Sequence, residues 1–385
     1  MFDRRSFIQT ALAAGSAAAF GPIGNVIARE NVEPGERPMS FLKEMLSSPS
    51  PSGYEQPVQK IWSKYTEQFA DVHSDSHGNA IGVVNPNGEP RLMLAGHCDE
   101  LGFMVKYIDD DGFIYFGTIG GFDQGIIPGR RVRIHAAGGP VLGVIGKGPI
   151  HLMSEEQRNK VSQVKDLCID IGAGDKNETE SLITIGDPIT YTYDFMELRN
   201  GMVVARAFDD RIGSFMVAET LRNLSLSKKL KASVFGVSTV QEEVGLRGAT
   251  TSAYGINPKV ALATDVTHAT DYPGINKKEF GEVKLGGGPV IGRGPNFNPA
   301  VFKLLVKTAE ANDIPYQILG YTRGSGTDAN AIQLTRAGVA TGLVSIPLRY
   351  MHTAVETLAL SDVVHITRLM TAFAGALTPD MDFMP

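Results

Sequence analysis

The sequence predicts an α/β protein with a mostly parallel sheet, helices on both faces, and a small β-rich domain inserted into it. Runs that resemble buried strands alternate with helical patterns early in the chain and again from about residue 203. From about residue 119 to that point, short β-rich pieces are separated by Gly, Pro and polar turns. Histidines and acidic residues recur at the expected strand ends, which is where open α/β sheets build their sites.

The size and charge of the chain restrict its possible functions. With 385 residues it can bury a large core, and two domains are more consistent with this length than one. The formal net charge is −6 and no cluster of Lys and Arg follows the N-terminus, so nucleic acid is not an expected partner. The two cysteines, Cys98 and Cys168, lie in unrelated segments, so we expect no disulfide.

The N-terminus has the pattern of a twin-arginine export signal. Arg4 and Arg5 precede an apolar Phe-Ile pair and an Ala-rich, weakly apolar stretch over residues 10–20. The alternative is an arginine pair that happens to precede an Ala-rich helix. We assign residues 1–30 to the signal and expect export to the periplasm. No later run reaches the ~18 apolar residues that a membrane span needs.

The first α/β part, residues 31–107, is predicted to begin with two helices. Ser52 or Gly53 is a plausible cap for the second of them. A turn Asp-Asp-Asp-Gly joins two alternating runs, which predicts a hairpin. The expected elements are helices at 39–46 and 54–69, strand-like runs at 73–84 and 91–95, and a hairpin of 101–108 with 112–118.

The inserted β-rich domain is assigned to residues 108–202, with edges near Tyr107 and Val203. The second α/β part follows as residues 203–385 and completes one catalytic domain with residues 31–107. Its repeated strand and helix units favour a mostly parallel sheet. The expected helices are at 211–224, 299–312, 328–336 and 360–377, and the expected strands at 231–240, 259–264, 316–319 and 339–345.

Two adjacent carboxylates, Glu242 and Glu243, follow the apolar run over residues 232–240. Neighbouring carboxylates repel each other, and the cost is lowest when a cation lies between them or when one keeps its proton. At a strand end the chain can turn so that both side chains reach one pocket, where one binds metal and the other acts as general base. The alternative is a solvated acidic pair at the start of a loop.

Four more residues of ligand type occupy similar positions, namely His97, Asp209, Asp265 and His352. The alternatives are ordinary buried histidines and, for Asp209, a helix cap with a salt bridge. Imidazoles and carboxylates without a thiolate cage suit Zn²⁺, Co²⁺ or Mn²⁺ in an open catalytic site. With Glu243, these candidates are too many for one tetrahedral ion that keeps a water, and about right for two ions that share a bridging carboxylate.

Such a pair of ions activates a shared water for attack on a carbonyl. Glu242 would take the proton of that water and pass it to the leaving amine. Asp99, two residues after His97, is well placed to accept the other ring N–H of that histidine and fix its tautomer.

The candidate residues lie in six short segments. These are Ala-Gly-His-Cys-Asp-Glu-Leu-Gly-Phe at 95–103, Phe-Asp-Asp-Arg at 208–211, Val-Gln-Glu-Glu-Val-Gly at 240–245, Thr-Asp-Val-Thr at 264–267, Gly-Thr-Asp-Ala at 326–329 and Arg-Tyr-Met-His-Thr at 349–353. In this order they resemble the signatures of the family forty-two metallopeptidases. These are dinuclear aminopeptidases of the tetrahedral, self-compartmentalising kind, some of them described as endoglucanases. The resemblance spans about residues 39–378 and includes the Ile-Gly-Gly-Phe-Asp segment at 119–123.

The resemblance implies a role for each candidate. The inserted domain would serve dimerisation, with dimers assembling into a hollow dodecamer. The sequence departs from the family pattern in two ways. It carries the pattern of an export signal, whereas relatives are mostly intracellular, and it has Thr353 where the family commonly has Ser. The implied site has Asp209 bridging two ions, His97 and Asp265 on one ion, Glu243 and His352 on the other, Glu242 as the base and Asp99 behind His97.

We therefore expect a metal-dependent aminopeptidase that removes the N-terminal residue of peptides after export. One alternative is a hydrolase of the same fold that acts on acylated amino acids or dipeptides. An endoglucanase fits less well, because glycosidases usually use two carboxylates at a fixed separation and no metal pair. A non-catalytic scaffold or binding protein is the remaining alternative, and the presence of every expected ligand and the base argues against it.

Overall fold

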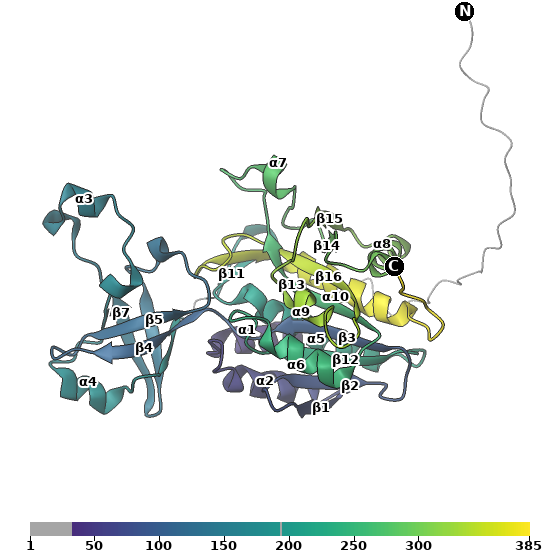
Figure 1. Ribbon diagram of the computed structural model, residues 1–385, viewed down its shortest axis with the longest axis horizontal. Coiled ribbons are helices and arrows are strands. Elements are labelled where there is room, and N and C mark those ends of the chain that lie inside the picture. Colours follow the sequence, from purple (N-terminus) through teal and green to yellow (C-terminus); the bar gives the residue numbers. More distant parts are fainter. Residues whose placement is uncertain (1–32, 193–194) are drawn as a thin grey trace, which may run out of the picture. The chain divides into compact units, whose positions relative to one another are not determined.

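The computed structural model describes residues 33–192 and 195–385 (Figure 1). The expected export signal lies outside the described residues. Within these ranges the strands form an eight-stranded sheet, a closed barrel of six strands and a three-stranded sheet. None of the helices in the described part of the chain combines the length and the hydropathy that a membrane span requires.

The large sheet is parallel at its centre. Its strand order is β1-β2-β12-β3-β13-β16-β14-β15. Strands β12, β3, β13 and β16 run parallel, whereas β2 and β14 join them antiparallel on either side. The prediction of a mostly parallel sheet is thus confirmed. The bounds are β1 (Asp71–Ser74), β2 (Ala80–Val84), β3 (Arg91–His97), β12 (Ser233–Thr239), β13 (Val260–His268), β14 (Val290–Arg293), β15 (Gln317–Gly320) and β16 (Ala340–Leu348).

The run expected as one strand at 73–84 is two strands, β1 and β2, paired antiparallel. The chain turns between them because the Asp75 carboxylate accepts backbone N–H groups from His77, Gly78 and Asn79, and Gly78 adopts a φ of 105°. A glycine takes that left-handed conformation at little cost.

Helices cover both faces of the large sheet, as predicted. Leu92 and Leu94 of β3 point into one apolar cluster, and the alternate residues Met93 and Ala95 point into the other. The first cluster includes residues of α1, α2, α5, α8 and α10, and the second includes residues of α6 and α9. The bounds are α1 (Glu36–Ser47), α2 (Gln56–Thr66), α5 (Phe208–Ser225), α6 (Arg247–Ile256), α8 (Pro299–Ala311), α9 (Asp328–Ile332) and α10 (Leu360–Ala376).

The predicted cap of the second helix is wrong. Helix α2 begins at Gln56 after Glu55, and its start carries no side-chain cap. The Ser52 hydroxyl instead donates to the Asp99 carboxylate, at 2.7 Å. Ser52, which was expected to cap the helix, therefore hydrogen-bonds to a residue of the candidate site described below.

The inserted domain is a barrel with the strand order β4-β5-β8-β7-β6-β9 (Figure 1). The predicted hairpin is confirmed, because β4 and β5 pair antiparallel. The aromatic ring of Phe103 lies in the barrel core with Phe116 and Tyr191. The bounds are β4 (Gly102–Ile108), β5 (Ile114–Ile119), β6 (Arg131–Ala136), β7 (Gly139–Ile145), β8 (Ile169–Asp170) and β9 (Pro188–Tyr191), with short helices α3 (Glu155–Arg158) and α4 (Lys176–Leu182).

The barrel occupies a slightly different stretch from the one assigned to the insert. It begins at Gly102, before Tyr107, because β4 pairs with β9 as well as with β5. It ends at Tyr191, and β11 joins β10 and β17 in the three-stranded sheet. These last strands are β10 (Met196–Glu197), β11 (Met202–Ala205) and β17 (Glu356–Ala359), and α7 (Lys277–Phe280) lies in the connection between β13 and β14.

Candidate active site

Four of the expected site residues lie where the parallel strands of the large sheet end. His97 is the last residue of β3 and lies opposite Thr239, the last residue of β12. Glu242 and Glu243 follow β12 directly, and Asp265 lies within β13 on the other side of β3. Sheet topology therefore brings together side chains that are far apart in the sequence.

Asp209 reaches the site from the first turn of α5, which lies close against the end of β3. The Asp210 carboxylate accepts the backbone N–H of His97 at 3.2 Å and that of Gly213 at 3.1 Å. The peptide bond between Asp209 and Asp210 is cis. A methyl group on Gly96 would lie 2.5 Å from the carbonyl carbon of Gly213, so the close approach of the strand to the helix requires glycine at position 96.

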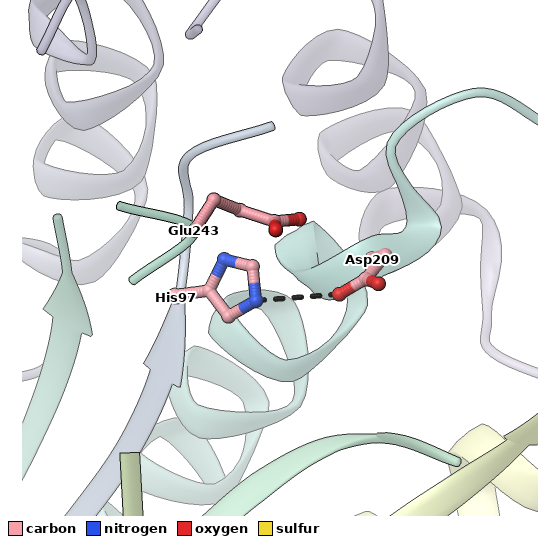
Figure 2. Close-up of side chains that lie close together, drawn as sticks. All are labelled: His97, Asp209 and Glu243. Carbon is pink, nitrogen blue, oxygen red and sulfur yellow. Dashed lines mark ion pairs between the residues drawn. The ribbon is translucent and has the colours of Figure 1, made fainter. Parts of the chain in front are cut away.

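The side chains converge on Asp209. Its Oδ1 lies 3.3 Å from Nε2 of His97, and its Oδ2 lies 3.2 Å from Nε2 of His352. Nε2 of His352 also lies 3.8 Å from Oε1 of Glu243. Figure 2 shows His97, Asp209 and Glu243 directed toward one another from a strand end, a helix start and a loop. One carboxylate thus lies between two imidazoles.

Ligand-type atoms of this cluster form two compact groups. In each group the atoms all lie within 4.8 Å of one another, a spacing that can hold a metal ion. His97 belongs to both groups, so the two potential positions are adjacent. The groups are His97 with Asp209 and Glu243, and His97 with Glu242 and Asp265.

Asp99 is placed behind His97, as expected, and it also holds the two glutamates. Its Oδ1 lies 3.4 Å from Nδ1 of His97, and its main-chain carbonyl is nearer, at 3.1 Å. The carboxylate accepts the backbone N–H of Glu242 at 3.0 Å and that of Glu243 at 3.2 Å. With the hydroxyl of Ser52 as a further donor, one buried carboxylate positions three site residues.

Sequence reasoning missed Glu356, a buried residue four positions after His352. Its Oε1 accepts the backbone N–H of His352 at 3.0 Å, and its Oε2 accepts that of Asp209 at 3.1 Å.

Sequence reasoning also missed Asp328, although the Gly-Thr-Asp-Ala segment had been singled out. Asp328 accepts a hydrogen bond from the Thr239 hydroxyl at 2.6 Å, and its Oδ1 is buried without a hydrogen-bond partner among the described residues.

Three loops of the site contain a non-glycine residue in the left-handed region, namely Ala207, Gln241 and His352, with φ of 62°, 55° and 62°. Such conformations cost on the order of 1–3 kcal/mol each and persist only where surrounding contacts impose them. Here buried carboxylates supply these contacts. Glu55 accepts the backbone N–H of Gln241 at 3.1 Å, and Glu356 accepts that of His352.

The electrostatics of the cluster favour bound cations. Burial, together with the charge of Asp209, raises the pKa of Glu243 to about 8. Burial also raises the pKa of Glu242 to about 11, against the opposing charge of His97 and with a smaller contribution from Asp265 in the same direction as burial. Burial alone would raise the pKa of Asp209, but hydrogen bonds from His352 and His97 hold it well below its usual range.

The donor set fits divalent metal ions. Oε1 of Glu243 is buried and has no hydrogen-bond partner among the described residues, so it is free to bind a cation. The side chains of His97, Asp209 and Asp265 are almost completely buried, and burial, with the charge of Asp209 adding to it, raises the pKa of Asp265 well above its usual range. Divalent ions would balance these crowded carboxylates and allow them to remain ionised.

The site faces a cavity of about 340 Å³. All the expected ligands line it, together with Glu242. A cavity of this size admits a small organic group or an amino-acid side chain. The arrangement can therefore bring a substrate directly against the cluster.

Residues 78–369 match the family model for M42 glutamyl aminopeptidases. The chain is 35% identical over 350 residues to the lysyl aminopeptidase of Pyrococcus furiosus, covering 90% of this chain and 99% of that protein. Its structure is similar to the TET aminopeptidase of the marine sediment archaeon Thaumarchaeota archaeon SCGC AB-539-E09, with a TM-score of 0.84, 35% identity and coverage of 89% and 96%.

The chain is also similar to the solved structure of the TET1 peptidase of Pyrococcus horikoshii, which can assemble into a tetrahedron or a large octahedral shell. The TM-score is 0.80 at 34% identity, and the match covers 88% of this chain and all of that one. Family, relatives and neighbours agree on a metal-dependent aminopeptidase, a hydrolase. The chain belongs to the M42 glutamyl aminopeptidase family.

Proposed function

We propose that this protein removes the N-terminal residue of peptides by a hydrolysis that depends on two divalent metal ions held by its cluster. The observation that supports this most directly is the position of Asp209, whose two oxygens each lie within 3.3 Å of a different imidazole. A carboxylate shared in this way suits a bridge between two ions.

Distances within the cluster support a division of the ligands. Asp209 would be shared, His97 with Asp265 would hold one ion, and His352 with Glu243, whose Oε1 is 3.8 Å from Nε2 of His352, would hold the other. Imidazole and carboxylate donors accept Zn²⁺ or Co²⁺ most readily and Mn²⁺ as well. When bound, the ions supply Lewis acidity, which polarises the scissile carbonyl and makes a water molecule more acidic.

Glu242 is the general base in this proposal. It lies beside the ligands, with Oε2 3.9 Å from Nε2 of His97, and its backbone is fixed by Asp99. It accepts the proton of the attacking water and then donates it to the leaving amine, so that the proton is conserved within one turnover. His97 and Asp265 form a compact group with Glu242, which places the base next to one metal position.

Replacing the base tests this assignment. Glu242→Gln keeps the size of the side chain but removes its capacity to accept a proton, so we expect kcat to fall by about 10²–10⁴-fold. The assay compares leaderless, Zn²⁺- or Co²⁺-loaded wild type and variant on free and N-acetylated aminoacyl anilides, with bound metal determined by elemental analysis. Cleavage of free-amine substrates alone, lost in the variant while metal is retained, supports the proposal.

Other outcomes redirect the proposal. Cleavage of the acetylated substrates would favour the hydrolase of acylated amino acids, and dipeptides would be the next panel. Activity that survives exhaustive chelation would contradict the metal-dependent mechanism, and restoration by Zn²⁺, Co²⁺ or Mn²⁺ would rank the metals. A Glu242→Gln enzyme with near-normal kcat would move the general base to another residue.

We also propose that the inserted barrel mediates dimerisation and that dimers assemble further, to a dodecamer. Its strand β7 exposes two apolar side chains, Leu142 and Val144, which are 63% and 48% accessible in the single chain. The solved relative with tetrahedral and octahedral assemblies supports this reading. Light scattering should give a mass of many subunits, and Leu142→Glu should reduce it. A monomeric wild type would contradict the proposal.

We propose that residues 1–30 direct export by the twin-arginine route to the periplasm. The support is the sequence pattern of Arg4, Arg5 and the apolar stretch that follows. Replacing both arginines by lysine should retain the full-length protein in the cytoplasm, as measured by fractionation. Unchanged export of that double variant would contradict the twin-arginine route.

A further inference from the structure

The cavity beside the cluster is also lined by residues that the reaction does not use. They come from three parts of the chain, the end of β13, strand β15 with the residue after it, and the segment just before His352. Five of the side chains that these segments contribute to the cavity lining are Val266, His268, Leu319, Tyr321 and Met351. We call this set the far wall.

The far wall is held in place by contacts outside the cavity. The ring of Tyr321 packs edge-on against Phe297, with ring centroids 5.2 Å apart and planes at 89°. Leu319 is covered by the segment after α7, since a methyl group on Gly281 would lie 2.7 Å from its Cδ1. The shape that a substrate meets is therefore largely formed in advance.

The far wall carries no acidic or strongly basic side chain among the described residues that line the cavity. His268, at its solvent-facing rim, has a pKa below its usual range because desolvation and the charge of His352 both disfavour the imidazolium. Arg323, the nearest cationic residue along the loop after Tyr321, is exposed and is not among the residues that line the cavity. The carboxylates that line the same cavity already have roles in the proposed function, as metal ligands or, for Glu242, as the general base.

We propose that the far wall receives the side chain of the substrate's N-terminal residue and selects neutral, mainly apolar side chains over charged ones. This rests on the proposed function, because the scissile bond must lie at the cluster for the N-terminal side chain to enter the cavity. A lysine or glutamate side chain would lose its hydration there without gaining a partner of opposite charge. Leucine and methionine side chains would instead exchange water for contacts with Leu319, Val266 and Met351.

A preference for neutral side chains would differ from the lysyl and glutamyl preferences stated in the names of relatives of this chain. A lysyl or a glutamyl preference requires a compensating charge in the cavity, because a buried unpaired charge is costly. The far wall offers neither sign of charge. Leu319 is the central determinant, since it lies on β15 and lines the cavity, whereas its neighbour Ile318 is 46% exposed and is not among the lining residues.

The first test is a panel of aminoacyl anilides with Leu, Met, Lys and Glu, assayed with the metal-loaded full assembly. We expect kcat/KM for Leu and Met to exceed that for Lys and Glu by about tenfold or more, the order of discrimination that side-chain pockets provide. Equal or higher values for Lys or Glu would overturn the proposal, and a preference for Glu would point to Arg323. Failure to cleave any free-amine substrate would overturn the proposed function itself.

The second test uses a matched pair of variants. Leu319→Glu places a carboxylate on the far wall, and we expect the Lys-to-Leu ratio of kcat/KM to rise by about tenfold or more. Ile318→Glu adds the same charge on the adjacent residue outside the cavity and should leave that ratio within about twofold of wild type. Equal shifts in both variants, or no shift in Leu319→Glu while its metal content and assembly are normal, would remove Leu319 from the far wall.

Discussion

Asp99 is hydrogen-bonded to both glutamates of the site and lies against the ring of His97. Asp99→Asn replaces one of its acceptor oxygens with an amide that faces N–H donors. We therefore expect metal affinity or kcat/KM to fall by about 10–100-fold, the usual effect of losing a residue that orients ligands. Zn²⁺ affinity is measured by competition with a chromophoric chelator. The control is Asp170→Asn, the same change at an exposed position at the end of β8, where the carboxylate accepts the backbone N–H of Gly172.

A different outcome for Asp99→Asn would be informative. If Zn²⁺ affinity and kcat/KM both stay within about twofold of wild type, the main-chain carbonyl of Asp99 alone orients His97. That carbonyl is the nearer of the two acceptors, at 3.1 Å from Nδ1. The carboxylate would then serve only the backbone of the two glutamates.

The sequence singled out candidate residues from the chemistry of their own side chains, and the structure brings these side chains together. His97 and Glu243 could be recognised because each follows an apolar run, and strand ends meet at one edge of a parallel sheet. Glu356 and Glu55 could not be recognised, because each accepts a backbone N–H from a residue more than a hundred positions away, and the nearer contact of Glu356, with the N–H of His352, depends on a loop conformation. Which backbone groups need a partner depends on loop conformations, and these emerge only from the folded chain.

The contact between β3 and α5 sets the distance between His97 and Asp209. The Ser214 hydroxyl donates to the carbonyl of Gly96 at 2.8 Å, and the backbone of α5 passes within methyl-group distance of Gly96. The Gly96→Ala change would push the helix away from the strand. We expect a loss of roughly 1–3 kcal/mol in unfolding free energy, typical of overpacking, together with reduced activity.

A control for Gly96→Ala is available in α6. Gly255→Ala adds the same methyl group where no atom lies within 4 Å, so it should be neutral or stabilise the helix by up to about 1 kcal/mol. Both variants are compared by chemical denaturation and by kcat/KM. If Gly96→Ala unfolds like the wild type and keeps its activity, the close approach does not position the site.

Element boundaries were harder to predict than element types. The run at 73–84 was predicted as one strand-like run although residues 75–79, Asp-Ser-His-Gly-Asn, are of turn-forming type. Backbone N–H groups that donate to the Asp75 carboxylate form the turn that separates β1 from β2. The hairpin at 101–118 was predicted correctly, but its membership of the barrel depends on pairing between β4 and β9. That pairing joins residues more than eighty positions apart, which no local pattern reveals.

The ionisable groups of the site make the stability of the metal-free protein depend on pH. The pKa of Glu243, about 8, and that of His352, about 9, lie above their ordinary values. A group whose pKa is raised by folding stabilises the protein at low pH, and this contribution is lost as the pH rises through the folded value. The lowered pKa of Asp209 acts in the opposite sense, but only at more acidic pH.

We therefore expect the Tm of the chelated protein to fall as the pH is raised from about 5 to 8, by roughly 2–4 °C or more. The Zn²⁺-loaded protein should show a weaker dependence, because the ions offset the repulsion among the carboxylates. Thermal unfolding followed by circular dichroism at several pH values measures both. A Tm of the metal-free protein that rises over this interval would contradict the electrostatic account.

The order in which strands are synthesised has a consequence for how this enzyme matures. Strand β3 lies between β12 and β13, which begin at Ser233 and Val260, and the barrel strands follow β3 immediately. During translation the barrel can therefore fold while both edges of β3 remain unpaired, for on the order of ten seconds. An unpaired apolar strand is prone to aggregation, so nascent chains should engage ribosome-associated chaperones. Because the proposed ligand His352 emerges near the end of synthesis, we expect the complete two-metal site to form only after translation.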